Sequence, residues 1–172
     1  MALMDVFGRY VEQGLNIKVE DFFNAGIMVM NLKKMREINI VGKLQELLSE
    51  HKFVVTQDED YLNVICKGHV KMIELGWNKC PLDNPDFDDK DLKLIHYKLA
   101  LKPWKYENIR YEEHFWKYAK RTEYYQMLLD MRNNYKNQEV DDLMLKNLMQ
   151  TAEDYIVNPN NYKNTLKKKG LI

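Results

Sequence analysis

The segment 22–32 constrains the fold most, because it is a nearly continuous apolar run broken only by a short patch of small and polar residues. An apolar run of this length is typical of a strand that is buried on both faces in the middle of an α/β sheet. Two shorter apolar segments, 70–75 and 92–97, predict further strands. We therefore expect an α/β fold for this part of the chain.

Segments with helical periodicity lie between and after these apolar runs. Apolar residues spaced three and four apart predict a helix over 40–50, and a second helix that begins at the capping-box sequence of residues 56–59. Seven glycines and four prolines in 172 residues are about half the usual share, which favours a helix-rich chain. Segments 111–135 and 140–157 also repeat at helical spacing. We expect an α/β part over 1–110 and a helical extension over 111–172.

The charge balance bears on the class of partner. Lys and Arg together number 26, as do Asp and Glu, so no broad basic field favours nucleic acid, and nucleic-acid binding is not expected. No apolar run reaches the ~20 residues of a bilayer span. Two cysteines cannot build a disulfide framework, which predicts a reducing, cytoplasmic location. Lys167, Lys168 and Lys169 form either a solvated tail or a weak attraction to anionic membranes, as in a peripheral membrane protein.

Asp58 and His96 are the first candidates for chemistry. Asp58 lies three residues before Tyr61 and four before Leu62, which places it on the predicted inward face of its helix. A carboxylate there either caps the helix or binds sugar hydroxyls and stabilises positive charge at a reacting carbon. His96 ends a predicted strand, where α/β sheets bind ligands; a structural hydrogen bond and a metal ligand are the two alternatives.

Two further clusters have both a structural and a functional interpretation. Asn24, Ala25 and Gly26 interrupt the apolar run either as a bulge or as a place where a ligand approaches the backbone closely. The lysines around Trp104, among them Lys102, form either a solvated loop or a clamp that neutralises a phosphate or pyrophosphate.

Six blocks of sequence occur in a specific order. They are 22–26 (FFNAG), 31–37 (NLKKMRE), 57–63 (QDEDYLN), 76–78 (GWN), 95–97 (IHY) and 102–104 (KPW). In this order they resemble the C-terminal half of family 8 glycosyltransferases, over roughly residues 10–110. The resemblance implies part of a GT-A fold with a mixed sheet. It also implies a retaining hexosyltransferase that moves a sugar from a UDP-sugar to a glycan or glycolipid acceptor, with Mn²⁺ on the pyrophosphate.

The resemblance also implies roles for single residues. Asp58 would bind donor-sugar hydroxyls, and Glu59 stands where the family has a glutamine on the reacting face of the sugar. His96 would be a manganese ligand, and Lys102 would contact the diphosphate. The donor sugar and the acceptor would lie against three consecutive residues: Asn24, Ala25 and Gly26.

Departures from the family pattern limit the expected activity. The D-x-D motif that supplies the other metal ligands normally precedes these blocks, and nothing before Phe22 provides it. Residues 58–60 have the D-x-D spelling but align with the sugar-binding helix. The turn over 97–101 lacks the family's glycine. We therefore expect the chain alone to be inactive or very weak. The alternative is a non-catalytic helical module that forms a homodimer or binds another protein through its aromatic and methionine side chains.

Overall fold

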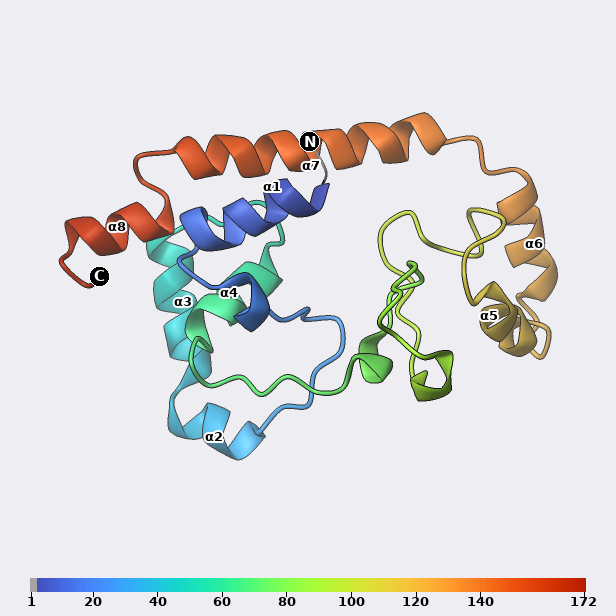
Figure 1. Cartoon of the computed structure of the whole chain (residues 1–172), viewed down its shortest axis with the longest axis horizontal. Helices are drawn as coiled ribbons and strands as arrows, with labels where there is room; N and C mark the ends of the chain where they lie inside the picture. Colours follow the sequence, from blue (N-terminus) through green and yellow to red (C-terminus); the bar gives the residue numbers. More distant parts are fainter. Residues whose placement is uncertain (1–2) are drawn as a thin grey trace. The chain divides into compact units, whose positions relative to one another are not determined.

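The computed structural model describes residues 3–172, with side chains from residue 4 (Figure 1). The chain divides into two compact units. Unit 1 extends to residue 72 and resumes at 144, and unit 2 comprises residues 73–143. The long helix α7 (Gln138–Val157) begins in unit 2 and continues into unit 1.

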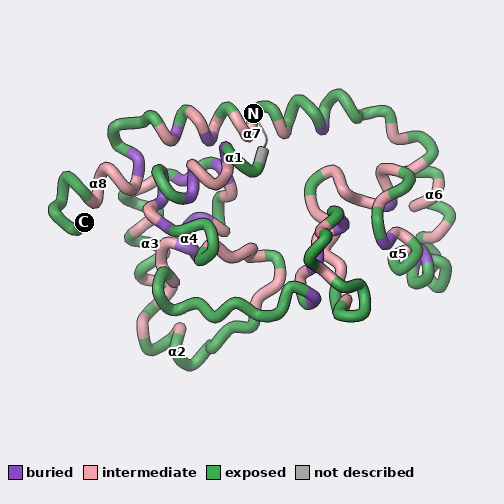
Figure 2. Tube along the Cα trace, viewed as in Figure 1, coloured by how far each residue is buried: buried purple, intermediate pink, exposed green. Residues whose placement is uncertain are grey.

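Unit 1 is built from short helices around one aromatic core. Its helices, besides α7, are α1 (Leu3–Arg9), α2 (Leu32–Glu37), α3 (Ile40–Glu50), α4 (Asp58–Ile65) and α8 (Tyr162–Lys168), and a π-helical turn (Tyr10–Gly14) continues α1. Buried positions gather around α1 and α4 (Figure 2). The Tyr10 and Tyr155 rings meet edge to face at 5.4 Å, and the Phe53 and Tyr61 rings lie 4.6 Å apart. Aromatic contacts of this kind join the π-helical turn to α7, and Phe53, in the segment before α4, contacts both Tyr61 of α4 and Tyr155 of α7.

Unit 2 combines two helices with long loops. Its helices are α5 (Glu112–Ala119) and α6 (Tyr125–Asn133), and it contains 3-10 turns at Leu75–Asn78 and Asp89–Asp91. Gly76 lies where the loops cross, because a Cβ there would meet the Asp91 carbonyl oxygen at 1.9 Å. Its own carbonyl accepts hydrogen bonds of 2.9 Å from the backbone N–H groups of Lys93 and Leu94. Only glycine permits this crossing.

The predicted α/β fold, including the partial GT-A fold with its mixed sheet, is wrong for this structure. Among residues 3–172 there is no strand, only an isolated parallel bridge between Lys79 and Ile95. Most residues of the apolar segments 22–32, 70–75 and 92–97 lie outside helices and strands, and Val29 is 90% exposed. Strand patterns express burial against neighbouring strands rather than an intrinsic backbone preference, and within residues 3–172 these segments do not assemble into a sheet.

The predicted helices agree better with the structure. α3 confirms the helix over 40–50, and α7 confirms the helix over 140–157. The single helix expected over 111–135 is instead α5 and α6, separated by a turn in which the Thr122 hydroxyl donates to the Ala119 carbonyl at 2.9 Å. The proposed boundary at residue 110 stays a prediction. None of the helices within residues 3–172 is both long and apolar enough to span a bilayer.

Candidate functional site

The candidate site in unit 1 is a turn held by a carboxylate from α4. One oxygen of Glu59, Oε2, accepts a hydrogen bond of 2.7 Å from the Asn24 side-chain amide and one of 2.8 Å from the Ala25 backbone N–H. The Gly26 N–H donates to the Asn24 side-chain oxygen at 3.1 Å. The structure thus brings four predicted site residues together, although 34 residues separate Ala25 from Glu59.

Asn63 completes this contact one turn further along α4. Its amide donates to the Phe23 carbonyl at 2.8 Å, and its side-chain oxygen accepts from the Phe23 N–H at 2.9 Å. Asn63 is only 2% exposed, so these hydrogen bonds are shielded from water. No role was predicted for Asn63 from the sequence. Its spacing of four from Glu59 was the available signal, because such residues share one helix face.

The capping arrangement of α4 differs from the prediction. Asp60, not Glu59, reaches back to Thr56, and its carboxylate accepts hydrogen bonds from the Thr56 N–H at 2.9 Å and the Thr56 hydroxyl at 2.5 Å. Burial raises the pKa of the Asp60 carboxyl, although the hydrogen bonds from Thr56 act in the opposite direction. The Glu59 carboxylate reaches the 24–26 turn.

The backbone before α4 is strained. Gln57 has φ 53° and ψ −110°, a conformation that favours glycine. Strain of this kind persists only where surrounding contacts impose it, and it is common at functional sites. The residues on either side of Gln57 are held by the hydrogen bonds from the Thr56 N–H to Asp60 and from the Ala25 N–H to Glu59.

Asp58 does not face inward, so that prediction was wrong. Its side chain is exposed, whereas Asp60 is fully buried. Asp58 lies in the first turn of α4, where the helix dipole favours a negative charge. It is therefore a solvent-accessible hydrogen-bond acceptor two residues from the buried capping acid.

The arrangement in unit 1 has clear chemical capabilities. The 24–26 turn and Asp58 offer amide and carboxylate groups at the surface, which are the groups that bind sugar hydroxyls. Glu59 already accepts two hydrogen bonds from its own chain. Its carboxylate therefore supports the turn, and this geometry favours a positioning role over that of a nucleophile.

His96, in unit 2, is oriented by Asn78. Its Nδ1 lies 2.9 Å from the Asn78 side-chain oxygen, and because a carbonyl oxygen only accepts, Nδ1 carries the hydrogen. Burial and then the positive charge of Lys98 lower the pKa of His96, so the imidazole is neutral at pH 7. Its Nε2 lone pair is thereby left for a proton or a metal ion.

The remaining unit 2 candidate, Lys102, has a separate partner. Its ammonium lies 5.7 Å from the centre of the Trp104 ring, a cation–π distance. Leu99, in the turn between His96 and Lys102, has φ 51°. The turn thus keeps the left-handed conformation that a glycine would favour, with a leucine in it.

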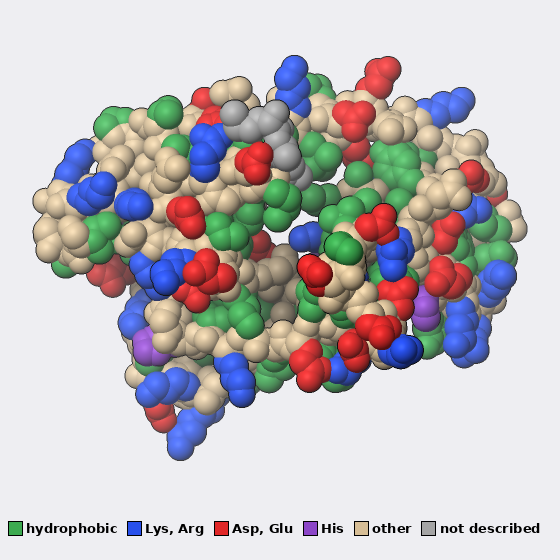
Figure 3. Space-filling model, in the orientation of Figure 1, with side chains coloured by type: hydrophobic (Ala, Val, Ile, Leu, Met, Phe, Trp, Pro, Cys, Tyr) green, Lys and Arg blue, Asp and Glu red, His purple; other side chains and the backbone are tan. Residues whose placement is uncertain are grey.

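The described residues fit a manganese ion only in part. The neutral His96 imidazole is a suitable single ligand, but no group of three or more His, Cys, Asp or Glu residues within 3–172 is placed to hold a metal. On the face shown in Figure 3, positive and negative side chains are interspersed. A ligand of this surface would therefore be recognised by local hydrogen bonds.

Comparison with known proteins gives a consistent result. The sequence profile of glycosyl transferase family 8 matches residues 8–108. A Haemophilus influenzae (strain ATCC 51907 / DSM 11121 / KW20 / Rd) protein named "Putative glycosyltransferase" is 32% identical over 101 residues, which are 58% of this chain and 31% of that protein. A lipopolysaccharide 1,2-glucosyltransferase of Escherichia coli (strain K12) is 26% identical over 121 residues, with shares of 63% and 33%.

The chain thus spans about a third of the length of these two relatives. No solved structure matches it. The profile match covers more than half of the chain and contains the blocks that form the 24–26 turn, the start of α4 and the His96 and Lys102 loops. This chain belongs to glycosyl transferase family 8.

Proposed function

We propose that this chain carries sugar-binding residues of a retaining hexosyltransferase that uses a UDP-sugar donor and a glycan or glycolipid acceptor. One observation carries the proposal. Glu59 holds the 24–26 turn through two hydrogen bonds to a single oxygen, and both segments belong to the family 8 match. The contact joins the two segments into one hydrogen-bonding surface.

Within this proposal each unit 1 residue has a distinct task. Asp58 and Asn24 bind hydroxyls of the donor sugar, and the Ala25–Gly26 backbone lets the sugar approach closely. Glu59 fixes the turn. Its negative charge also favours positive charge that develops at the anomeric carbon when the bond to the diphosphate weakens.

The unit 2 candidates would serve the leaving diphosphate. Lys102 would neutralise part of its negative charge, and His96 would offer its Nε2 as one ligand to Mn²⁺. The metal, when bound, would neutralise the negative charge of the leaving group. The described residues present a single fitting ligand, so we assign no step to the metal.

Titration of the chain with UDP-glucose and UDP-galactose in the presence of Mn²⁺, by isothermal calorimetry, tests the proposal. Glu59→Ala should weaken binding at least fivefold, because the turn loses its anchor. Glu46→Ala, an exposed acid on α3, is the matched control and should leave binding unchanged. Absence of binding by the wild-type chain, or equal affinities for the two variants, would refute the proposed sugar site.

Turnover is a separate measurement. We propose that the chain alone hydrolyses UDP-sugars weakly or not at all, and a Mn²⁺-dependent hydrolysis assay with His96→Ala as the comparison tests this. Robust wild-type turnover would refute the proposed weak activity. Turnover that His96→Ala leaves intact would refute the role of the imidazole.

A non-catalytic interaction module is the second candidate. The observation in its favour is the exposure of large apolar side chains in two extended segments, with Val29 90%, Met72 46% and Ile73 48% exposed. This candidate predicts a concentration-dependent homodimer that is indifferent to nucleotide. Light scattering at several concentrations, with and without UDP, decides between it and the transferase proposal.

A further inference from the structure

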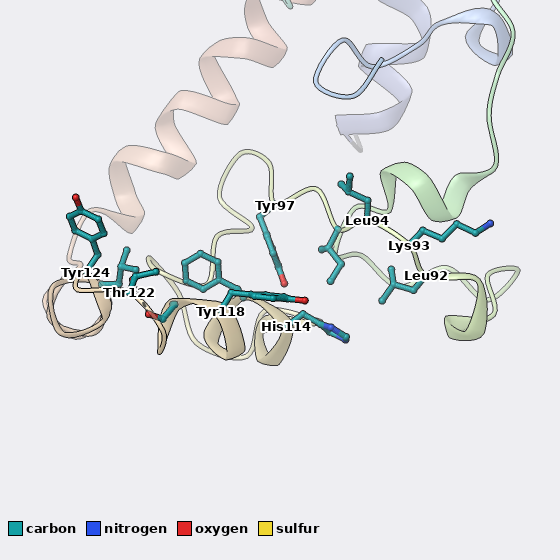
Figure 4. Close-up of a pocket in the computed structure, with 12 residues that line it drawn as sticks. Leu92, Lys93, Leu94, Tyr97, His114, Tyr118, Thr122 and Tyr124 are labelled. Atoms are coloured by element: carbon teal, nitrogen blue, oxygen red, sulfur yellow. Dashed lines mark hydrogen bonds between the residues drawn. The ribbon is translucent and has the colours of Figure 1, made fainter. Parts of the chain in front are cut away.

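Unit 2 contains a cavity of about 640 Å³ that none of the predicted site residues lines. It lies between the segment 92–97 and helices α5 and α6 (Figure 4). Ligand-binding cavities commonly have volumes of about 300–1,000 Å³, so this space is large enough for a small molecule. Its apolar walls are formed by Leu92, Leu94, Ile95, Phe115, Ala119 and Leu128.

The polar groups of the lining are largely engaged by the protein itself. The Tyr97 hydroxyl donates to the Tyr111 carbonyl, and the Thr122 hydroxyl donates to the Ala119 carbonyl. The Lys93 ammonium is paired with the Glu74 carboxylate. A bare sugar needs partners for most of its hydroxyls, whereas a hydrocarbon group needs none. The lining therefore suits an alkyl chain.

Polar atoms at the edge of the cavity suit the other end of such a ligand. His114 and Tyr118 project from α5 beside Tyr97 (Figure 4). Tyr118 is 62% exposed, and the side chains of Lys117 and Arg121 lie 5.8 Å and 5.7 Å from its ring centre. An aromatic rim with cations close by fits a polar head group and keeps it in water.

We propose that this cavity binds the hydrocarbon chain of a single amphiphile, with the polar head at the Tyr118 rim. The identification of that amphiphile as the lipid part of a glycolipid acceptor rests on the proposed function. The binding itself does not, because it requires only the cavity and its apolar lining. The driving force is removal of the chain from water, which grows with each methylene group.

Binding of hexyl, heptyl and octyl β-glucoside as monomers, below their micellar concentrations, tests the proposal on the whole chain by calorimetry. Affinity should rise about fourfold per added methylene, and glucose alone should not bind. Leu94→Lys should weaken octyl glucoside binding at least tenfold, since it places a charge against the alkyl chain. Leu94 is 38% exposed, so the substituted side chain can be accommodated.

The controls keep the proposal falsifiable. Leu143→Lys, at a 56% exposed position of α7 in unit 2, should bind octyl glucoside like the wild type. Tyr124→Ala removes lining at a 55% exposed position. It should weaken octyl glucoside binding about threefold, so the proposal can still be tested if Leu94→Lys fails to fold.

Several results would overturn the proposal. These are equal binding of glucose and octyl glucoside, affinity that is independent of chain length, binding that Leu94→Lys leaves unchanged, and binding to phospholipid vesicles without binding to monomers. The outcome is separable from the transferase proposal. Leu94→Lys should leave UDP-glucose affinity intact, and a failure of UDP-sugar binding would leave the alkyl-chain dependence in place.

Discussion

Replacement of Glu59 by alanine should loosen the 24–26 turn and destabilise unit 1. The substitution removes the acceptor of two hydrogen bonds, from the Asn24 amide at 2.7 Å and the Ala25 N–H at 2.8 Å. A hydrogen bond to a charged group contributes about 1.5–3 kcal/mol when it is buried. Because Glu59 is only half-buried, water replaces part of each bond. We expect a loss of about 2–3 kcal/mol in the free energy of unfolding.

Glu59→Gln is the matched control. Its amide oxygen can still accept both hydrogen bonds and loses only the charge, which roughly halves their strength. The expected loss is about 1 kcal/mol. If Glu59 supports the turn, the order of stability is therefore wild type, then glutamine, then alanine. A role through charge alone would make the two variants equally unstable.

The assay uses the placement of the tryptophans. Trp77, Trp104 and Trp116 all lie in unit 2, whereas Glu59 lies in unit 1. Urea unfolding followed by far-ultraviolet circular dichroism reports the helices, and tryptophan fluorescence is an internal control on unit 2. An alanine variant that loses less than about 0.5 kcal/mol, within the range of ordinary surface substitutions, would refute the reasoning.

Three other substitutions test separate features. Burial holds the folded-state pKa of Asp60 above its ordinary value of 3.8, so the contribution of this carboxyl to the free energy of unfolding falls as the pH rises above 3.8. Asp60→Asn should abolish this decline in urea titrations across pH 4–7. Gly76→Ala places a Cβ 1.9 Å from the Asp91 carbonyl oxygen, and should lower the free energy of unfolding of unit 2 by about 2–3 kcal/mol in fluorescence-detected unfolding. An unchanged unfolding midpoint would disprove the close crossing. Val29→Asp, at a 90% exposed position, should shift stability by less than about 0.5 kcal/mol; a loss above about 2 kcal/mol would show that Val29 is buried.

The sequence predicted helices well where local spacing decides the structure. α3 and α7 follow from apolar residues repeated every three or four positions. The break between α5 and α6 was missed because the spacing continues across it, and the chain holds neither glycine nor proline there. Thr122 ends the pattern by hydrogen bonding to the carbonyl three residues earlier, which competes with the helix.

The arrangement of the candidate site residues was predicted only in part. Asn24, Ala25 and Glu59 were identified and lie together, but the inward face of α4 was placed on the wrong acid. The sequence pattern predicts Tyr61 and Leu62 on the buried side, whereas the residues buried with Tyr61 are Asp60 and Asn63. Hydropathy cannot reveal an inward face made of hydrogen-bonded polar side chains.

The failed strand prediction and the unexpected polar face of α4 have a common physical cause. A backbone segment that crosses the interior must find partners for its N–H and C=O groups. In a sheet the neighbouring strands would supply them, but residues 23–25 lie in no strand in the part of the chain that the structure describes. α4 supplies the partners instead, Asn63 to both polar groups of Phe23 and Glu59 to the Ala25 N–H. The side chains that replace a sheet here are therefore the same ones that fix the candidate sugar-binding turn. For this reason substitutions at Glu59 should alter stability and sugar affinity together, while those at Asp58, exposed and outside this network, should alter affinity with a stability change of only about 0.3–1 kcal/mol from the helix dipole.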